Sequence, residues 1–191
     1  MRTTTALAVA AAFALGGFVS AYALLGRNPA DKASTAESTP RPVWTEAQWP
    51  FLMDQWGKGA AFQCTAADCG SEVNLYLRAK IGFCNCTTGV ADDEELERLS
   101  DFDLLGGELL PLDAGRPVMI AWMKGRSRAY KLTARNRPGR TAISIAFNNG
   151  CDAVVATIIL AQDRPEKFQP SVIEFLNGST GLSWTKEALG L

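Results

Sequence analysis

The residues of this sequence whose chemistry stands out are its five cysteines. Four of them lie within 23 residues, as the stretches CTAADC and CNC, and the fifth comes much later; they are Cys64, Cys69, Cys84, Cys86 and Cys151. Thiols at such spacing can form disulfides, bind a soft metal ion such as Cu(I), or exchange disulfides. The chain contains no histidine, which excludes Ser-His-Asp and Cys-His catalysis and any zinc site that needs imidazole.

The spacing leaves the pairing of the cysteines open. A bond between Cys64 and Cys69 closes a short loop easily, whereas a bond between Cys84 and Cys86 closes a strained ring that is readily reduced. Cys151 is the odd residue: a buried thiol, a partner of Cys84 or Cys86, or an intermolecular link. We expect structural disulfides with Cys64, Cys69, Cys84 and Cys86 as candidates. The alternative is a thiol-based Cu(I) or disulfide-exchange site on Cys84 and Cys86, with Cys64 and Cys69 as further metal ligands.

The first 42 residues predict the compartment. Arg2 is followed by no charged residue until Arg27, so residues 1–25 are expected to be a signal peptide or an N-terminal membrane anchor, with residues 5–25 as a possible inner-membrane tether. Residues 26–42 are rich in Pro, Ser, Thr, Ala and charge, and we expect a disordered linker. Residues 43–191 are then a single domain that is periplasmic or otherwise exported, where disulfides are the default.

Charge is unevenly divided along the chain. Residues 92–108 hold eight acidic residues and one basic residue, whereas residues 114–151 hold no acidic residue at all. The functional interpretation is a basic surface for an anionic partner, with Lys124, Arg126, Arg128 and Lys131 as candidates. The competing interpretation is a solvated face that is partly paired with the acidic segment of the same chain. Nucleic acid is not an expected partner outside the cytoplasm.

Hydrophobic periodicity predicts the elements that position these residues. Residues 72–83 alternate and predict a strand with one buried face, while Arg78 and Lys80 lie on the polar face. Residues 92–105 predict a helix with an acidic first turn. Residues 116–135 predict two strands around a turn at Gly125, and residues 141–161 two more around Asn149–Gly150.

Short helices are expected at the two ends of the domain. Thr45 and Gln48 have the spacing of a capping box, and Pro50 limits any helix there to a turn or two. The nearby aromatic residues Trp44, Trp49, Phe51 and Trp56 are expected to cover a core edge, or else to form a ligand platform. A helix after Pro170 that ends near Gly178, and residues 182–191, close the chain.

The order of these elements predicts an α+β fold: a hairpin-rich antiparallel sheet of about five to seven strands, flanked by short helices. This order resembles the small α/β/α sandwich of PsbP-like photosystem accessory proteins, in which a hairpin-rich sheet is likewise followed by a closing C-terminal helix. The stretches CNCTTGVADDEEL and VIEFLNG are similar to those of uncharacterised exported proteins of Gram-negative bacteria. The second resemblance implies a compartment and no activity.

No recognised catalytic motif is present: the sequence has no Walker loop, GxSxG or HExxH. We therefore assign no catalytic residue and expect no cofactor. The leading hypothesis is a non-enzymatic, disulfide-stabilised periplasmic accessory or binding protein that docks on an envelope protein or an anionic surface.

Overall fold

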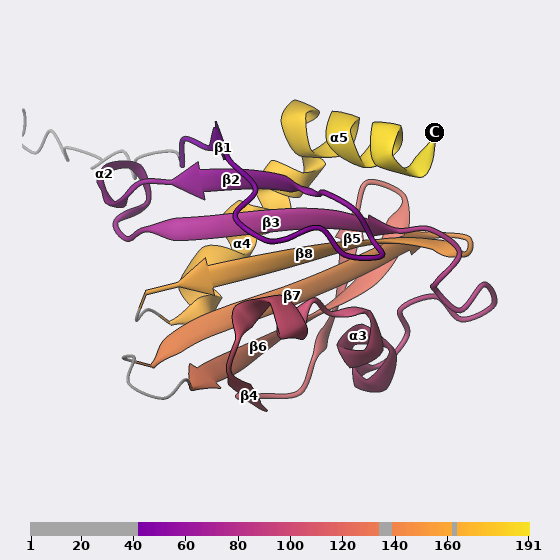
Figure 1. Cartoon of the computed structure of the whole chain (residues 1–191), viewed down its shortest axis with the longest axis horizontal. Coiled ribbons are helices and arrows are strands. Elements are labelled where there is room, and N and C mark those ends of the chain that lie inside the picture. Colours follow the sequence, from indigo (N-terminus) through magenta and orange to yellow (C-terminus); the bar gives the residue numbers. More distant parts are fainter. Residues whose placement is uncertain (1–41, 134–138, 162–163) are drawn as a thin grey trace, which may run out of the picture. The chain divides into compact units, whose positions relative to one another are not determined.

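The structure is a computed structural model that describes residues 42–133, 139–161 and 164–191. These residues fold as one α+β domain around an antiparallel sheet of eight strands, which confirms the predicted fold class (Figure 1). The strand order is β1-β2-β3-β8-β7-β6-β4, with β5 also paired to β6. The sheet has slightly more strands than the five to seven expected, since β1, β2 and β4 were not predicted.

Along the chain, helices follow β2, β3 and β8, and the other strands follow one another directly. The strands are β1 (Thr45–Ala47), β2 (Ala60–Cys64), β3 (Val73–Lys80), β4 (Glu108–Pro111), β5 (Arg116–Ile120), β6 (Met123–Thr133), β7 (Arg140–Asn149) and β8 (Asp152–Leu160). The helices are α2 (Ala66–Cys69), α3 (Asp93–Leu99), the 3-10 helix η1 (Phe102–Leu105), α4 (Pro165–Asn177) and α5 (Ser179–Leu189).

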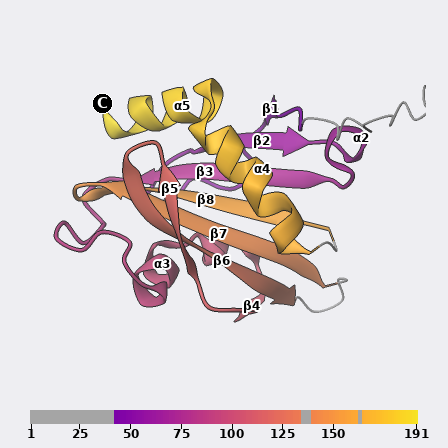
Figure 2. The ribbon, with the colours of Figure 1, turned by 180° about the vertical axis from the view of Figure 1, so that it is seen from behind.

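The main core lies between one face of the sheet and the C-terminal helices. Figure 2 shows α4 crossing this face diagonally, with α5 following it along the β2–β3 side. The apolar residues of α4 that pack on the sheet recur at i, i+4 and i+8, as a helix needs to bury one stripe. The fully buried residues of this core include Leu75, Leu77, Ile143, Ile145, Phe147, Val154, Ile158, Val172 and Leu176.

The opposite face of the sheet is covered by α3, η1 and the segment of residues 48–59 (Figure 1). The central strands place small residues here, such as Ala146 and Ala153, and Leu96 and Leu99 of α3 pack against them. Small side chains on the sheet let α3 approach closely, so this second core is thin. Charged residues border it.

Two expectations about local structure were wrong. Residues Thr45–Ala47 form the edge strand β1 instead of a helix, because pairing with β2 satisfies their backbone and Pro50 prevents a helix from extending. The β5–β6 turn lies at Ala121–Trp122, not at Gly125. Gly125 is instead inside β6, opposite Phe147, where the strand runs close to β7.

The β7–β8 hairpin matches its sequence signal, since Asn149 pairs with Asp152 and Gly150 takes a positive φ of 61° at the tip. The helix predicted after Pro170 begins earlier, at Pro165, and contains Pro170. Pro170 is inside α4, where its missing N–H costs one helical hydrogen bond. Packing of Phe168 and Val172 on the sheet outweighs that loss.

Gly125 gives a direct test of the β6–β7 contact. A side chain at this position would overlap the carbonyl oxygen of Ala146 and the side chain of Phe147. We expect Gly125→Ala to lower the free energy of unfolding by about 2–4 kcal/mol, measured by urea denaturation. Gly139→Ala is the matched control, because among the described residues its Cβ would have no neighbour closer than 3.9 Å. Equal stability of the two variants would contradict the close approach of these strands.

Candidate functional site

The basic residues predicted to bind an anionic partner are mostly engaged within the chain. Arg126 pairs with Asp93 of α3 and also donates to the carbonyl oxygen of Gly115, at 3.0 Å. Arg128 pairs with Glu97 at 2.8 Å. The acidic segment therefore neutralises the arginines of β6, as the competing interpretation of the charge pattern expected.

The two lysines of the candidate set do not share one surface. Lys124, Arg126 and Arg128 lie on the same face of β6, because the turn precedes all three. Lys131 is an odd number of residues away and lies on the opposite face. Lys124 and Lys131 are both exposed, so the structure does not bring the four candidates together as one basic patch.

A second charged cluster, which the sequence did not predict, lies on β3. Arg78 and Lys80 are 1% and 4% exposed, although strand alternation placed them on the solvent side. Lys80 pairs with Asp101 at 3.0 Å, and Arg78 pairs with Asp54 and with Asp101. These charges are buried because the segment of residues 48–59 folds over β3.

Two tryptophans complete this cluster. The Arg78 guanidinium lies 5.2 Å from the centre of the Trp49 ring, and the Lys80 ammonium lies 5.2 Å from that of Trp56. The prediction that these tryptophans cover a core edge agrees with this arrangement. One sequence signal could have revealed the buried charges. It is the aromatic-rich stretch around Asp54, because aromatic rings and a carboxylate can together cover a cation.

The pKa shifts of the acids follow from their surroundings. The hydrogen bond from Arg126 holds the pKa of Asp93 below its usual value, against the effect of burial. Burial alone would raise the pKa of Asp54, but the hydrogen bond from Arg78 keeps it lowered. Burial raises the pKa of Asp101 in spite of the nearby Lys80 and Arg78. These acids bind the chain's own cations.

The cysteines form two disulfides, Cys64–Cys69 and Cys86–Cys151. Cys84, which the sequence grouped with the disulfide candidates, carries a buried free thiol. Both residues lie in the turn region after β3, where strand alternation does not apply: Cys84 packs in the thin core beside α3, whereas Cys86 is exposed and bonds Cys151. Cys151 is therefore a bonded partner, one of the three roles left open for it.

The cysteines considered as Cu(I) ligands are mostly oxidised in the structure. Three of the four, Cys64, Cys69 and Cys86, are in disulfides and offer no thiolate. Among the residues that the structure describes, no group of three or more potential metal ligands is found.

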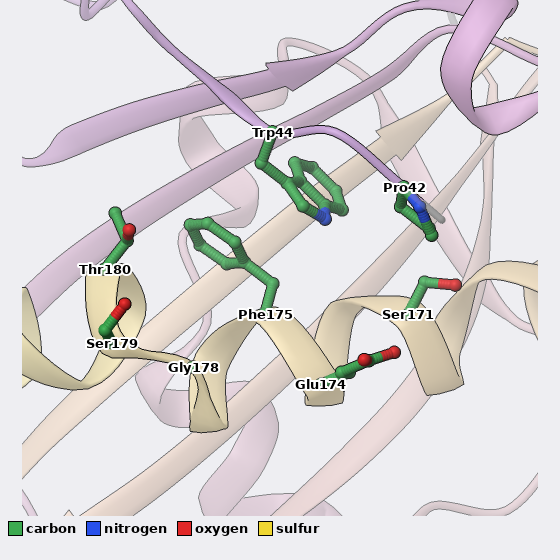
Figure 3. A pocket seen from close by; sticks show the side chains of 8 residues that line it. All are labelled: Pro42, Trp44, Ser171, Glu174, Phe175, Gly178, Ser179 and Thr180. Atoms are coloured by element: carbon green, nitrogen blue, oxygen red, sulfur yellow. The ribbon is translucent and has the colours of Figure 1, made fainter. Parts of the chain in front are cut away.

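A groove of about 480 Å³ opens between the segment before β1 and the junction of α4 and α5 (Figure 3). The half-buried rings of Trp44 and Phe175 form its wall, with centroids 5.1 Å apart. Glu174 is exposed at its rim and makes no ion pair with any described residue. Its other lining residues are Pro42, Ser171, Gly178, Ser179 and Thr180. An aromatic wall beside an unpaired carboxylate is suited to an organic cation.

The comparisons with known proteins give no family for this chain. No family model matches it, and no curated protein matches it at a significant level. The two disulfides indicate an oxidising, exported compartment. Within residues 42–133, 139–161 and 164–191, no helix has the length and apolar character required to span a bilayer. The expected signal or anchor of residues 1–25, the tether of residues 5–25 and nearly all of the 26–42 linker lie outside the described residues.

The Asp93–Arg126 pair predicts a pH dependence of stability. Because the pKa of Asp93 is lowered on folding, its stabilisation is complete above the unfolded value of about 3.8 and is lost as the pH falls through the folded value. We expect Asp93→Asn to lower the free energy of unfolding at pH 7 by about 1–3 kcal/mol, and the difference from the unmodified protein to shrink below pH 4.

Glu94→Gln provides the control, since Glu94 also lies in the first turn of α3 but is exposed. Denaturant unfolding at several pH values measures both variants. If the control loses as much stability as Asp93→Asn, the loss reflects the helix dipole and not the pair with β6.

Proposed function

We propose that this protein is an exported accessory or binding protein, without catalysis of its own, that docks on an envelope protein through the groove beside β1. The observation that supports this proposal is the groove itself, with its aromatic wall and a rim carboxylate that forms no ion pair with a described residue. The periplasm is the compartment that we propose, since residues 1–25 have the pattern of an export signal or anchor and the disulfides suit an oxidising space.

The chemistry of the groove favours a basic side chain of the partner. A lysine or arginine can stack on Trp44 or Phe175 while its charge pairs with Glu174. The neighbouring strand β1 is at the edge of the sheet and pairs with β2. An extended segment of the partner can therefore add backbone hydrogen bonds to β1.

An anionic surface is the weaker of the two partners considered. Arg126 and Arg128 are committed to Asp93 and Glu97, and exposed lysines on opposite faces of β6 do not form a common site. We likewise do not favour Cu(I) binding, because disulfide formation has consumed three of its four candidate ligands.

A pair of peptides tests the chemistry of the groove. We expect an extended peptide with a central lysine to bind more tightly than the same peptide with glutamine, because only lysine pairs with Glu174. Glu174→Lys should weaken binding of the lysine peptide about tenfold or more, measured by calorimetric titration. Lys131→Glu, on β6 and several strands away from β1 along the sheet, is the control and should leave binding unchanged. No preference for the lysine peptide would overturn the assignment of a basic ligand.

Site-specific crosslinking tests the docking on an envelope protein in cells. A photoreactive amino acid at Ser171, within the groove, should give a discrete adduct, and the same group at Lys131 should not. The adduct at Ser171 should diminish when Glu174→Lys is added. Adducts that are equally strong from both positions, or insensitive to Glu174→Lys, would contradict a specific role for the groove.

A further inference from the structure

Three cysteines come together at the end of the sheet where β3 finishes and the β7–β8 turn lies. Cys86 and Cys151 are disulfide-bonded, and Cys84 is free. The backbone N–H of Cys84 donates to the carbonyl oxygen of Cys151, with 3.0 Å between the two atoms. This bond places the two residues side by side, as a disulfide between them requires.

The loop that carries Cys84 is held in place by its neighbours on both sides. Asp152 of β8 accepts from the N–H of Gly82 at 2.6 Å, and Glu95 of α3 accepts from that of Asn85 at 3.1 Å. Arg98 of α3 donates to the carbonyl oxygen of Phe83 at 2.6 Å. The backbone of Cys84 is therefore fixed next to Cys151, which carries one sulfur of the disulfide.

We propose that Cys84 is the internal nucleophile of the Cys86–Cys151 disulfide, so that the chain interconverts two disulfide isomers. In this step the Cys84 thiolate attacks the Sγ atom of Cys151, the Cys84–Cys151 bond forms, and the Cys86–Cys151 bond breaks. Cys86 leaves as a thiolate and takes up the proton that Cys84 lost. One disulfide and one thiol are present before and after, so no external oxidant or reductant is needed.

The direction of attack follows from geometry. Attack on Cys86 would join residues two positions apart in a strained ring, whereas Cys151 lies across from Cys84 on a separate segment. The product differs from the starting state in one chemical respect: the free thiol moves from a buried position to Cys86, which is exposed. The protein thereby stores a protected thiol and presents it at the surface in the second isomer, where a disulfide of another exported protein can react with it.

The surroundings of Cys84 slow the exchange near neutral pH. Burial raises the pKa of the Cys84 thiol, the nearby acids Glu95 and Asp152 raise it further, and Arg98 opposes them. Cys84 must also leave its apolar contacts beside α3, such as Leu96 and Val155, before it can bond Cys151. The rate of exchange should therefore rise with pH, about tenfold per unit while the thiol is mostly protonated.

Trapping of thiols in the folded protein tests this proposal, which is independent of the proposed groove. The folded chain is incubated with iodoacetamide at pH 7, 8 and 9 and acidified to stop exchange. It is then unfolded, its remaining thiols are labelled with an isotopic reagent, and the unreduced peptides are mapped. We expect the first label on Cys86, together with a Cys84–Cys151 linked peptide, and the second label on Cys84.

The control is Cys84→Ser, which lacks the nucleophile. It should keep the Cys86–Cys151 bond and show no label on Cys86 at any pH. Cys84→Ala serves the same purpose if the buried hydroxyl of serine impairs folding, and near-UV circular dichroism checks both variants. First labelling confined to Cys84, the absence of labelling in the folded state, or labelling of Cys86 in the Cys84 variants would each overturn the proposal.

Discussion

The structure depends on charge pairing between the acidic segment after the cysteine loop and the basic strands beneath it. Asp93 and Glu97 lie one helical turn apart and reach Arg126 and Arg128, which are two residues apart on β6. On the other side Asp101 pairs with Lys80. Lys80 and Asp101 are both buried, and an unpartnered buried charge costs several kcal/mol, so this pair fixes the start of η1 over β3. The half-buried pairs with Arg126 and Arg128 hold α3 over β6.

The position of α3 in turn decides what the neighbouring surfaces can do. Through Glu95 and Arg98 the helix holds the loop of Cys84, which keeps a thiol beside a disulfide. The same helix pairs with Arg126 and Arg128 of β6, so these two arginines do not form a free basic surface. The net charge of −1 is therefore a poor guide to partners, because acidic and basic side chains pair with each other across the sheet.

The features that were predictable from the sequence depend on local patterns. Strand alternation identified β3, the Asn149–Gly150 signal located the β7–β8 hairpin, and an acidic first turn marked α3. Contacts between distant segments were not predictable in this way. Gly125 has the composition of a turn residue, yet it serves the close approach of β6 to β7, and Arg78 is buried only because a segment from before β2 folds over it.

The candidate groove and the cysteine cluster lie on opposite faces and toward opposite ends of the sheet. Thr45, next to Trp44, is paired with Gln63 near the start of β3, whereas Cys84 follows the end of that strand. Cys84 packs on the face that carries α3, and Phe175 of the groove belongs to the core of α4 and α5. Coupling between two sites needs an element with two arrangements that both sites bias. The central strands between the groove and the cysteine cluster are paired in a single register and supply no such element. Disulfide exchange and ligand binding should therefore be independent of each other.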